Sequence, residues 1–135
     1  MSLDDKPDFY TKVKELKTLN SDILLSVLSD LDSDSQILLL TQIISDLNLG
    51  FEDISLALKT NDTYQMHSVS HRFKTLCGTF GFDKLALASE AVCDAEREGQ
   101  IHTVTVISHW LAENIMPAIH ELKQEDIYKN ANNLV

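Results

Sequence analysis

Glycine and proline are scarce in this chain, with four and two residues among 135. An all-β domain needs many tight turns, and a disordered chain is rich in polar residues and proline, so both classes are excluded. Hydrophobic residues make up 44% of the chain, enough to form a buried core. The length fits one domain, and we therefore expect a single all-α domain.

Basic residues are also few. Eleven Lys and Arg stand against 21 Asp and Glu, which gives a formal net charge of -10. Nucleic acids and anionic membranes are bound through clustered Lys and Arg, so the composition argues against both partners. No apolar run is long enough to span a bilayer, and the acidic start does not resemble a signal peptide. We predict a soluble, cytoplasmic protein that acts as a monomer.

Cysteine occurs only twice, as Cys77 and Cys93. Their spacing fits neither a zinc site nor a disulfide framework. Free cysteine usually behaves as a small apolar residue, so both are predicted to be buried or half-buried.

Apolar residues recur at helical spacing through most of the chain. The clearest helix is predicted from 36 to 59, and others over 22–31, 63–79, 83–98 and 103–123, with a short one after Pro7. Long helices joined by short connections predict an antiparallel four-helix bundle over 21–123. Residues 1–20 are expected to form an extension with a short helix, and 124–135 a polar, frayed C-terminal tail.

The ends and interruptions of these helices are marked by particular residue types. Capping residues are predicted at Ser21, Asp62, Asp83 and Thr103, and Gly81 is predicted to end the helix over 63–79. Gly50 lies inside a helix, where it costs about 1 kcal/mol relative to alanine and marks a possible bend. Pro117 lacks the amide hydrogen that its helix requires, so we expect the last helix to be kinked there.

The helix over 63–79 carries the candidate site. On a helical wheel, His71 stands almost opposite the apolar residues Val69, Phe73 and Leu76, and is therefore predicted to face water. The residues nearest to His71 on the wheel are His67, Lys74, Thr75 and Gly78. The segment 63–82 contains no Asp or Glu, while Arg72 and Lys74 supply positive charge. Such a face suits a bound phosphate and a closely approaching protein.

At these residues the sequence resembles the histidine-containing phosphotransfer (HPt) domains of two-component phosphorelays. The family pattern is His, any residue, Leu, Lys, Gly, five residues and Gly. Here the pattern is His71, Arg72, Phe73, Lys74, Thr75 and, in register, Gly81. The resemblance covers roughly 21–123, and Phe73 and Thr75 replace the family's more usual Leu and Gly.

The resemblance implies that His71 carries a phosphoryl group between the aspartates of receiver domains, and that Lys74 balances the phosphate charge. His67, Arg72, Thr75 and Gly78 are expected to form the binding face, with Phe73 and Gly81 as structural residues of the motif. The implied partners are response-regulator receiver domains and a sensor histidine kinase, which can be of the hybrid type.

The resemblance also implies that the chain is a phosphotransfer intermediate without autokinase activity. We expect it to have no cofactor of its own, since the receiver domain would contribute Mg²⁺. The alternative is an interaction protein, either a degenerate HPt domain or a helical adaptor, that binds a receiver domain without phosphotransfer.

A metal site is the competing interpretation of the two histidines. His67 and His71 are four residues apart, which places both imidazoles on one helix face, as metal ligands often are. No third ligand lies near them in the sequence, and Lys74 would repel a cation, so no metal site is predicted. The remaining histidines, His102, His109 and His120, belong to no motif and are expected on the surface. Cys93 would lie on the facing helix, where packing is its expected role.

Overall fold

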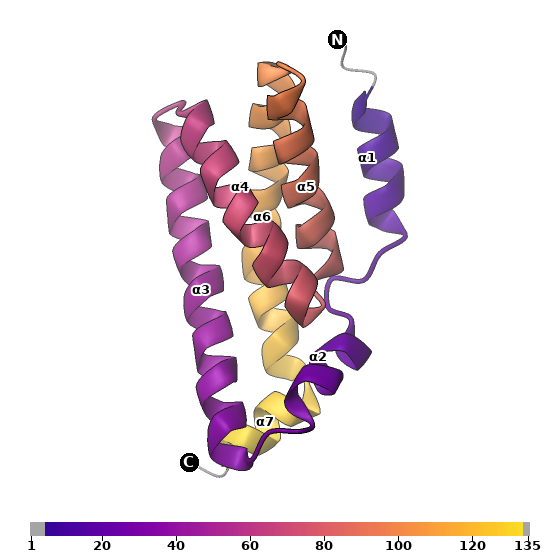
Figure 1. Ribbon diagram of the computed structural model, residues 1–135, viewed down its shortest axis with the longest axis vertical. Helices are drawn as coiled ribbons and strands as arrows, with labels where there is room; N and C mark the ends of the chain where they lie inside the picture. Colours follow the sequence, from indigo (N-terminus) through magenta and orange to yellow (C-terminus); the bar gives the residue numbers. More distant parts are fainter. Residues whose placement is uncertain (1–4, 134–135) are drawn as a thin grey trace.

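The helical periodicity of the sequence is realised along almost the whole chain. The computed structural model describes residues 5–133, and these residues form seven helices and no strand (Figure 1). The helices are α1 (Asp5–Lys14), α2 (Ser21–Leu28), α3 (Ser33–Lys59), α4 (Thr63–Phe80), α5 (Asp83–Arg97), α6 (Ile101–Gln124) and α7 (Asp126–Asn133). The all-α prediction is confirmed for these residues.

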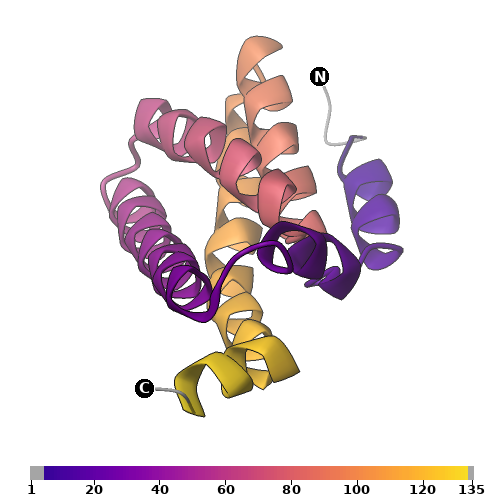
Figure 2. The same cartoon turned by 60° about the horizontal axis from the view of Figure 1, so that its bottom comes forward.

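The four long helices α3, α4, α5 and α6 pack against one another. The chain reverses direction at each turn between them, so that α3 and α5 rise in Figure 1 while α4 and α6 descend. Helix α3 contacts α4 and α6, and α5 contacts the same two helices from the other side (Figures 1 and 2). This arrangement is compatible with the predicted antiparallel bundle, and it leaves one face of each helix open to water.

Two short helices extend the packing beyond the long ones. Helix α1 lies along α5, where Phe9 is buried and its ring meets Trp110 edge-on, with 5.4 Å between the ring centroids. Helix α7 packs against α3 and α6, with Ala131 only 4% exposed. The frayed tail predicted for 124–135 is therefore wrong over 126–133, because apolar side chains in this largely polar segment are sufficient to dock it.

The predicted caps divide into correct and incorrect ones. The Asp62 side chain accepts a hydrogen bond from the Gln65 backbone N–H at the start of α4, and Gly81 ends that helix with φ +90°. Helix α5 instead begins at Asp83 without a side-chain cap, and α2 begins at Ser21 in the same way. Thr103 lies within α6, which starts two residues earlier, and its buried hydroxyl has no partner among the described residues.

Pro117 is accommodated inside α6, which continues to Gln124. The next residues, Ala118 and Ile119, are buried, so the C-terminal part of α6 still contributes to the core. The helix is therefore not broken at Pro117. The kink expected there stays a prediction.

Candidate functional site

Helix α4 presents a buried face and an open face of opposite character. Met66, Val69, Phe73 and Cys77 are at most 3% exposed and point into the core. His71 stands on the other face and is exposed, as the helical wheel predicts. The cap at Asp62 and the glycine at position 81 mark the two ends of this helix. The open face of α4 therefore lies between these two residues.

Gly50 on α3 sets how deeply α4 is seated. A Cβ at this position would lie 3.0 Å from Cδ1 of Phe73, and closer still to Cε1 and Cζ of the same ring. The absent side chain of Gly50 is therefore the space that the Phe73 ring occupies. From the sequence alone, Gly50 is interpreted only as a destabilising residue and a possible bend in a long helix. In the structure, the absence of its side chain makes room for the ring of Phe73.

The two histidines of α4 lie side by side, and one of them has an acidic neighbour. The ring centroids of His67 and His71 are 6.2 Å apart. Nε2 of His67 is 3.8 Å from a carboxylate oxygen of Glu96 on α5. The predicted neighbours His67 and His71 are thus brought together, while Glu96 is a member of the site that the sequence pattern does not reveal.

Arg72 is exposed and turned toward α3. Its guanidinium is 3.3 Å from a carboxylate oxygen of Asp53 on α3, and the ion pair is exposed. The place of Arg72 in the binding face stays a prediction. One position along a helix turns the side chain by about 100°, enough to carry it to the neighbouring helix.

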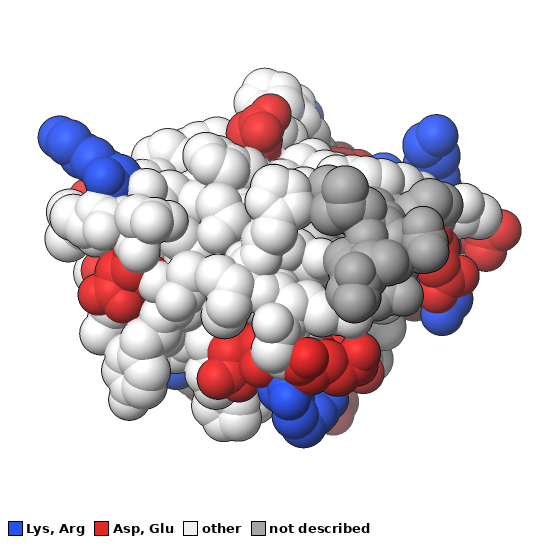
Figure 3. Space-filling view, turned by 90° about the horizontal axis from the view of Figure 1, so that it is seen from above, with Lys and Arg blue, Asp and Glu red and all other residues white. Residues whose placement is uncertain are grey.

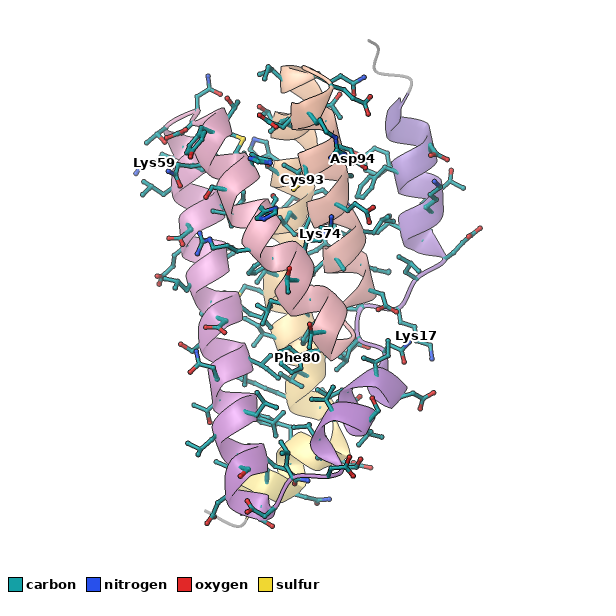
Figure 4. All side chains as sticks on the ribbon, viewed as in Figure 1. Lys17, Lys59, Lys74, Phe80, Cys93 and Asp94 are labelled. Carbon is teal, nitrogen blue, oxygen red and sulfur yellow. The ribbon has the colours of Figure 1, made fainter. Side chains whose placement is uncertain are left out.

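Lys74 lies on the opposite side, toward α5. Figure 4 shows Lys74 and Cys93 at the junction of α4 and α5. Among the side chains that the structure describes, Lys74 has no carboxylate within ion-pair distance, in contrast to Arg72. Its ammonium group is exposed and is available to an incoming anion.

Cys93 is a packing residue at the edge of the site. It is 7% exposed. Burial raises the pKa of the Cys93 thiol, and the positive charge of Lys74 acts in the opposite direction. The thiol therefore stays protonated near neutral pH, which agrees with the prediction of a small buried residue.

Thr75 and Gly78 contribute only small side chains to the open face of α4. Both are exposed. A Cβ at Gly78 would meet no atom within 4 Å, so the packing of this chain does not require glycine there. Glycine inside a helix costs about 1 kcal/mol relative to alanine. The internal packing of the described residues therefore does not explain the glycine at this position.

The end of the molecule seen from above has no concentration of positive charge. Seen from above, Lys and Arg lie at separate places and form no continuous patch on that end (Figure 3).

No group of three or more His, Cys, Asp or Glu residues is arranged to hold a metal ion in the part of the chain that the structure describes. Within the same residues, no helix is both long and apolar enough to cross a bilayer.

Comparisons with protein-family models, with curated proteins and with solved structures found no match. The chemistry of the site must therefore be inferred from its own residues. An exposed imidazole, a lysine on the same helix with no ion-pair partner among the described residues, and a small-residue surface beside them are suited to nucleophilic attack on a phosphoryl group presented by another protein.

Proposed function

We propose that this chain is a phosphohistidine carrier of the HPt type, and that α3, α4, α5 and α6 form its antiparallel four-helix bundle. His71 would accept a phosphoryl group from the aspartyl phosphate of one receiver domain and pass it to the aspartate of another. Mg²⁺ would be bound by the receiver, and the chain itself would have no autokinase activity. The partners are response regulators and a sensor kinase, in the cytoplasm.

The observation that carries the proposal is the position of His71 on α4. The imidazole is exposed opposite a fully buried face, and Lys74 follows one helical turn later without an ion-pair partner among the described residues. These residues fall in the register of the HPt pattern that ends at Gly81. A solvated surface histidine would need neither the unpaired lysine nor the carboxylate-free helix around it.

The transfer step requires little from this chain. A neutral imidazole nitrogen of His71 donates its lone pair to phosphorus, and the bond from phosphorus to the aspartyl oxygen breaks, with the electron pair returning to the carboxylate. The ring retains its other N–H and becomes positively charged. Lys74 then stabilises the phosphoryl oxygens by charge-assisted contact, while the receiver supplies the metal.

Chemical phosphorylation tests the proposal without a known partner. The protein is incubated with phosphoramidate, and separately with a phosphorylated receiver domain, and its intact mass is followed. We expect an acid-labile gain of one phosphoryl group that is absent in His71→Ala. His109→Ala, which removes another exposed histidine, is the matched control and should be phosphorylated like the wild type.

Two results would contradict the carrier function. The first is no gain of mass with either donor, and the second is a gain that persists in His71→Ala. Binding of the receiver without any mass gain would instead identify the chain as an adaptor that lacks phosphotransfer.

A further inference from the structure

The outer surface of α3 carries leucines that face solvent. Leu38, Leu49 and Leu56 are 71%, 50% and 59% exposed. Steps of 11 and seven residues are close to whole numbers of helical turns, so the three side chains lie on one stripe, called here the α3 leucine stripe. Isolated exposed leucines are ordinary, and Gln42 and Glu52 separate these three along the helix. Their significance therefore depends on what lies beside them.

Two hollows between α3 and α4 adjoin this stripe. The first has a volume of about 240 Å³ and is lined by Asp46, Leu49, Gly50, Val69, Arg72, Phe73 and Leu76. The second lies next to Leu56 and is also lined by Asp53, Ala57, Thr60, Asp62 and Gln65. Arg72 lines the first hollow and its ion-pair partner Asp53 lines the second. The two hollows are called here the groove, and the first of them is lined mainly by apolar residues.

The charge around this groove is mainly negative. Helix α3 contains four carboxylates and one lysine, Lys59, at its last position. Asp46 lines the first hollow, Asp62 lines the second, and the cation of Arg72 is already paired with Asp53. An occupant with Lys or Arg would complement this charge. A second copy of the chain, with its own charge of -10, would bring carboxylates against carboxylates.

We propose that the α3 leucine stripe and the adjoining groove bind an amphipathic helix of a partner protein, with Lys or Arg beside its aliphatic side chains. Such a helix lays its apolar face into a groove and forms ion pairs along the rim. Leu38 and Leu56 are 18 residues apart, so a helix of similar length, about 27 Å, spans the stripe. The surface lies beside the open face of α4, so that a partner can be held while His71 stays accessible.

A designed peptide tests the class of ligand directly. The probe is a fluorescent 18-residue helix-forming peptide with leucines three and four residues apart and lysines flanking them, and the control peptide has glutamates in place of the lysines. Binding is measured by anisotropy at physiological ionic strength. We expect the lysine peptide to bind and the glutamate peptide not to bind.

Variants of this chain then locate the site. Leu49→Gln with Leu56→Gln should weaken binding by about tenfold or more, since exposed anchors dominate such interfaces. Asp46→Asn should weaken binding about threefold through lost charge complementarity. Leu25→Gln on α2 and Glu121→Gln on α6 change exposed residues elsewhere and should leave the affinity unchanged.

Three outcomes overturn the proposal: no binding of the lysine peptide, equal binding of both peptides, or full affinity in the double leucine variant. Sedimentation showing that the wild-type chain dimerises through these leucines would also overturn it, by assigning the surface to a second copy. The double leucine variant should still gain a phosphoryl group from phosphoramidate. Failure of the peptide and failure of the carrier function are therefore separate results.

Discussion

Alanine substitutions at two helical glycines should have opposite effects on stability. Both glycines lie inside α-helices, where alanine is favoured by about 1 kcal/mol. Gly78 is exposed, and an added Cβ meets nothing within 4 Å, so Gly78→Ala should gain most of that amount. Gly50 faces Phe73, and an added Cβ there overlaps the ring.

The size of the Gly50→Ala effect follows from the burial of Phe73. The ring is 3% exposed and cannot swing into water without losing its place in the core. Forcing an extra carbon into a packed core costs about 1–3 kcal/mol, and full loss of a buried phenylalanine costs about 3–5 kcal/mol. An overpacking cost of about 3 kcal/mol is partly offset by the helix-propensity gain of about 1 kcal/mol. The net loss in the free energy of unfolding is therefore about 2 kcal/mol. For a chain of this size, that lowers Tm by roughly 6–10 °C.

Urea and thermal unfolding followed by circular dichroism measure both effects. The double variant Gly50→Ala with Phe73→Leu removes ring atoms where the Cβ is added, and should recover at least about 1 kcal/mol relative to the sum of the single changes. A Gly50→Ala protein as stable as the wild type would refute the proposed packing. So would a double variant that shows no coupling.

Three further changes test the site and its supports. Lys74→Gln should lower the rate of phosphoryl gain by His71 roughly tenfold, as judged by intact mass over time, while the unfolding midpoint stays unchanged. Gly81→Ala places a side chain at φ +90° with its Cβ 2.7 Å from the Asn20 carbonyl oxygen, and should cost about 2 kcal/mol in urea unfolding. The hydrogen bond from the Ser35 N–H lowers the pKa of Asp32 below 3.8. The free energy of unfolding of the wild type relative to Asp32→Asn should therefore be constant at pH values well above 3.8. It should fall as the pH drops through the lowered pKa, because the folded protein then loses the ionised cap.

The sequence predicts most of the helices because each is specified locally. The periodicity of apolar residues places α3 to α6 within a few residues of their observed ends, and Asp62 and Gly81 mark both ends of α4. Helix α7 was not predicted because its order depends on contact with α3 and α6, not on its own composition. The incorrect caps have a similar cause, since Thr103 is taken into a helix that begins earlier.

The exposure of His71 is predictable for the same reason, since it depends only on the phase of a single helix. The partners of the neighbouring residues are not predictable in this way. The contact of His67 with Glu96 and that of Arg72 with Asp53 both cross between helices. The relative shift of two packed helices depends on how their side chains interlock, and no pattern within one helix contains that information.

These cross-helix contacts distinguish the basic side chains of α4. Arg72 is committed to α3 through Asp53, and His67 faces Glu96 on α5, whereas Lys74 has no such carboxylate among the described residues. A dianionic phosphoryl group on His71 would therefore find its counter-charge in Lys74, one turn away on the same helix. An Asp53→Asn substitution would free Arg72 from its ion pair, but the position of Arg72 on the wheel would still direct it toward α3. The rate at which His71 gains a phosphoryl group should therefore fall far more in Lys74→Gln than in Asp53→Asn. Equal effects of the two substitutions would show that Lys74 is not the specific counter-charge of the phosphoryl group.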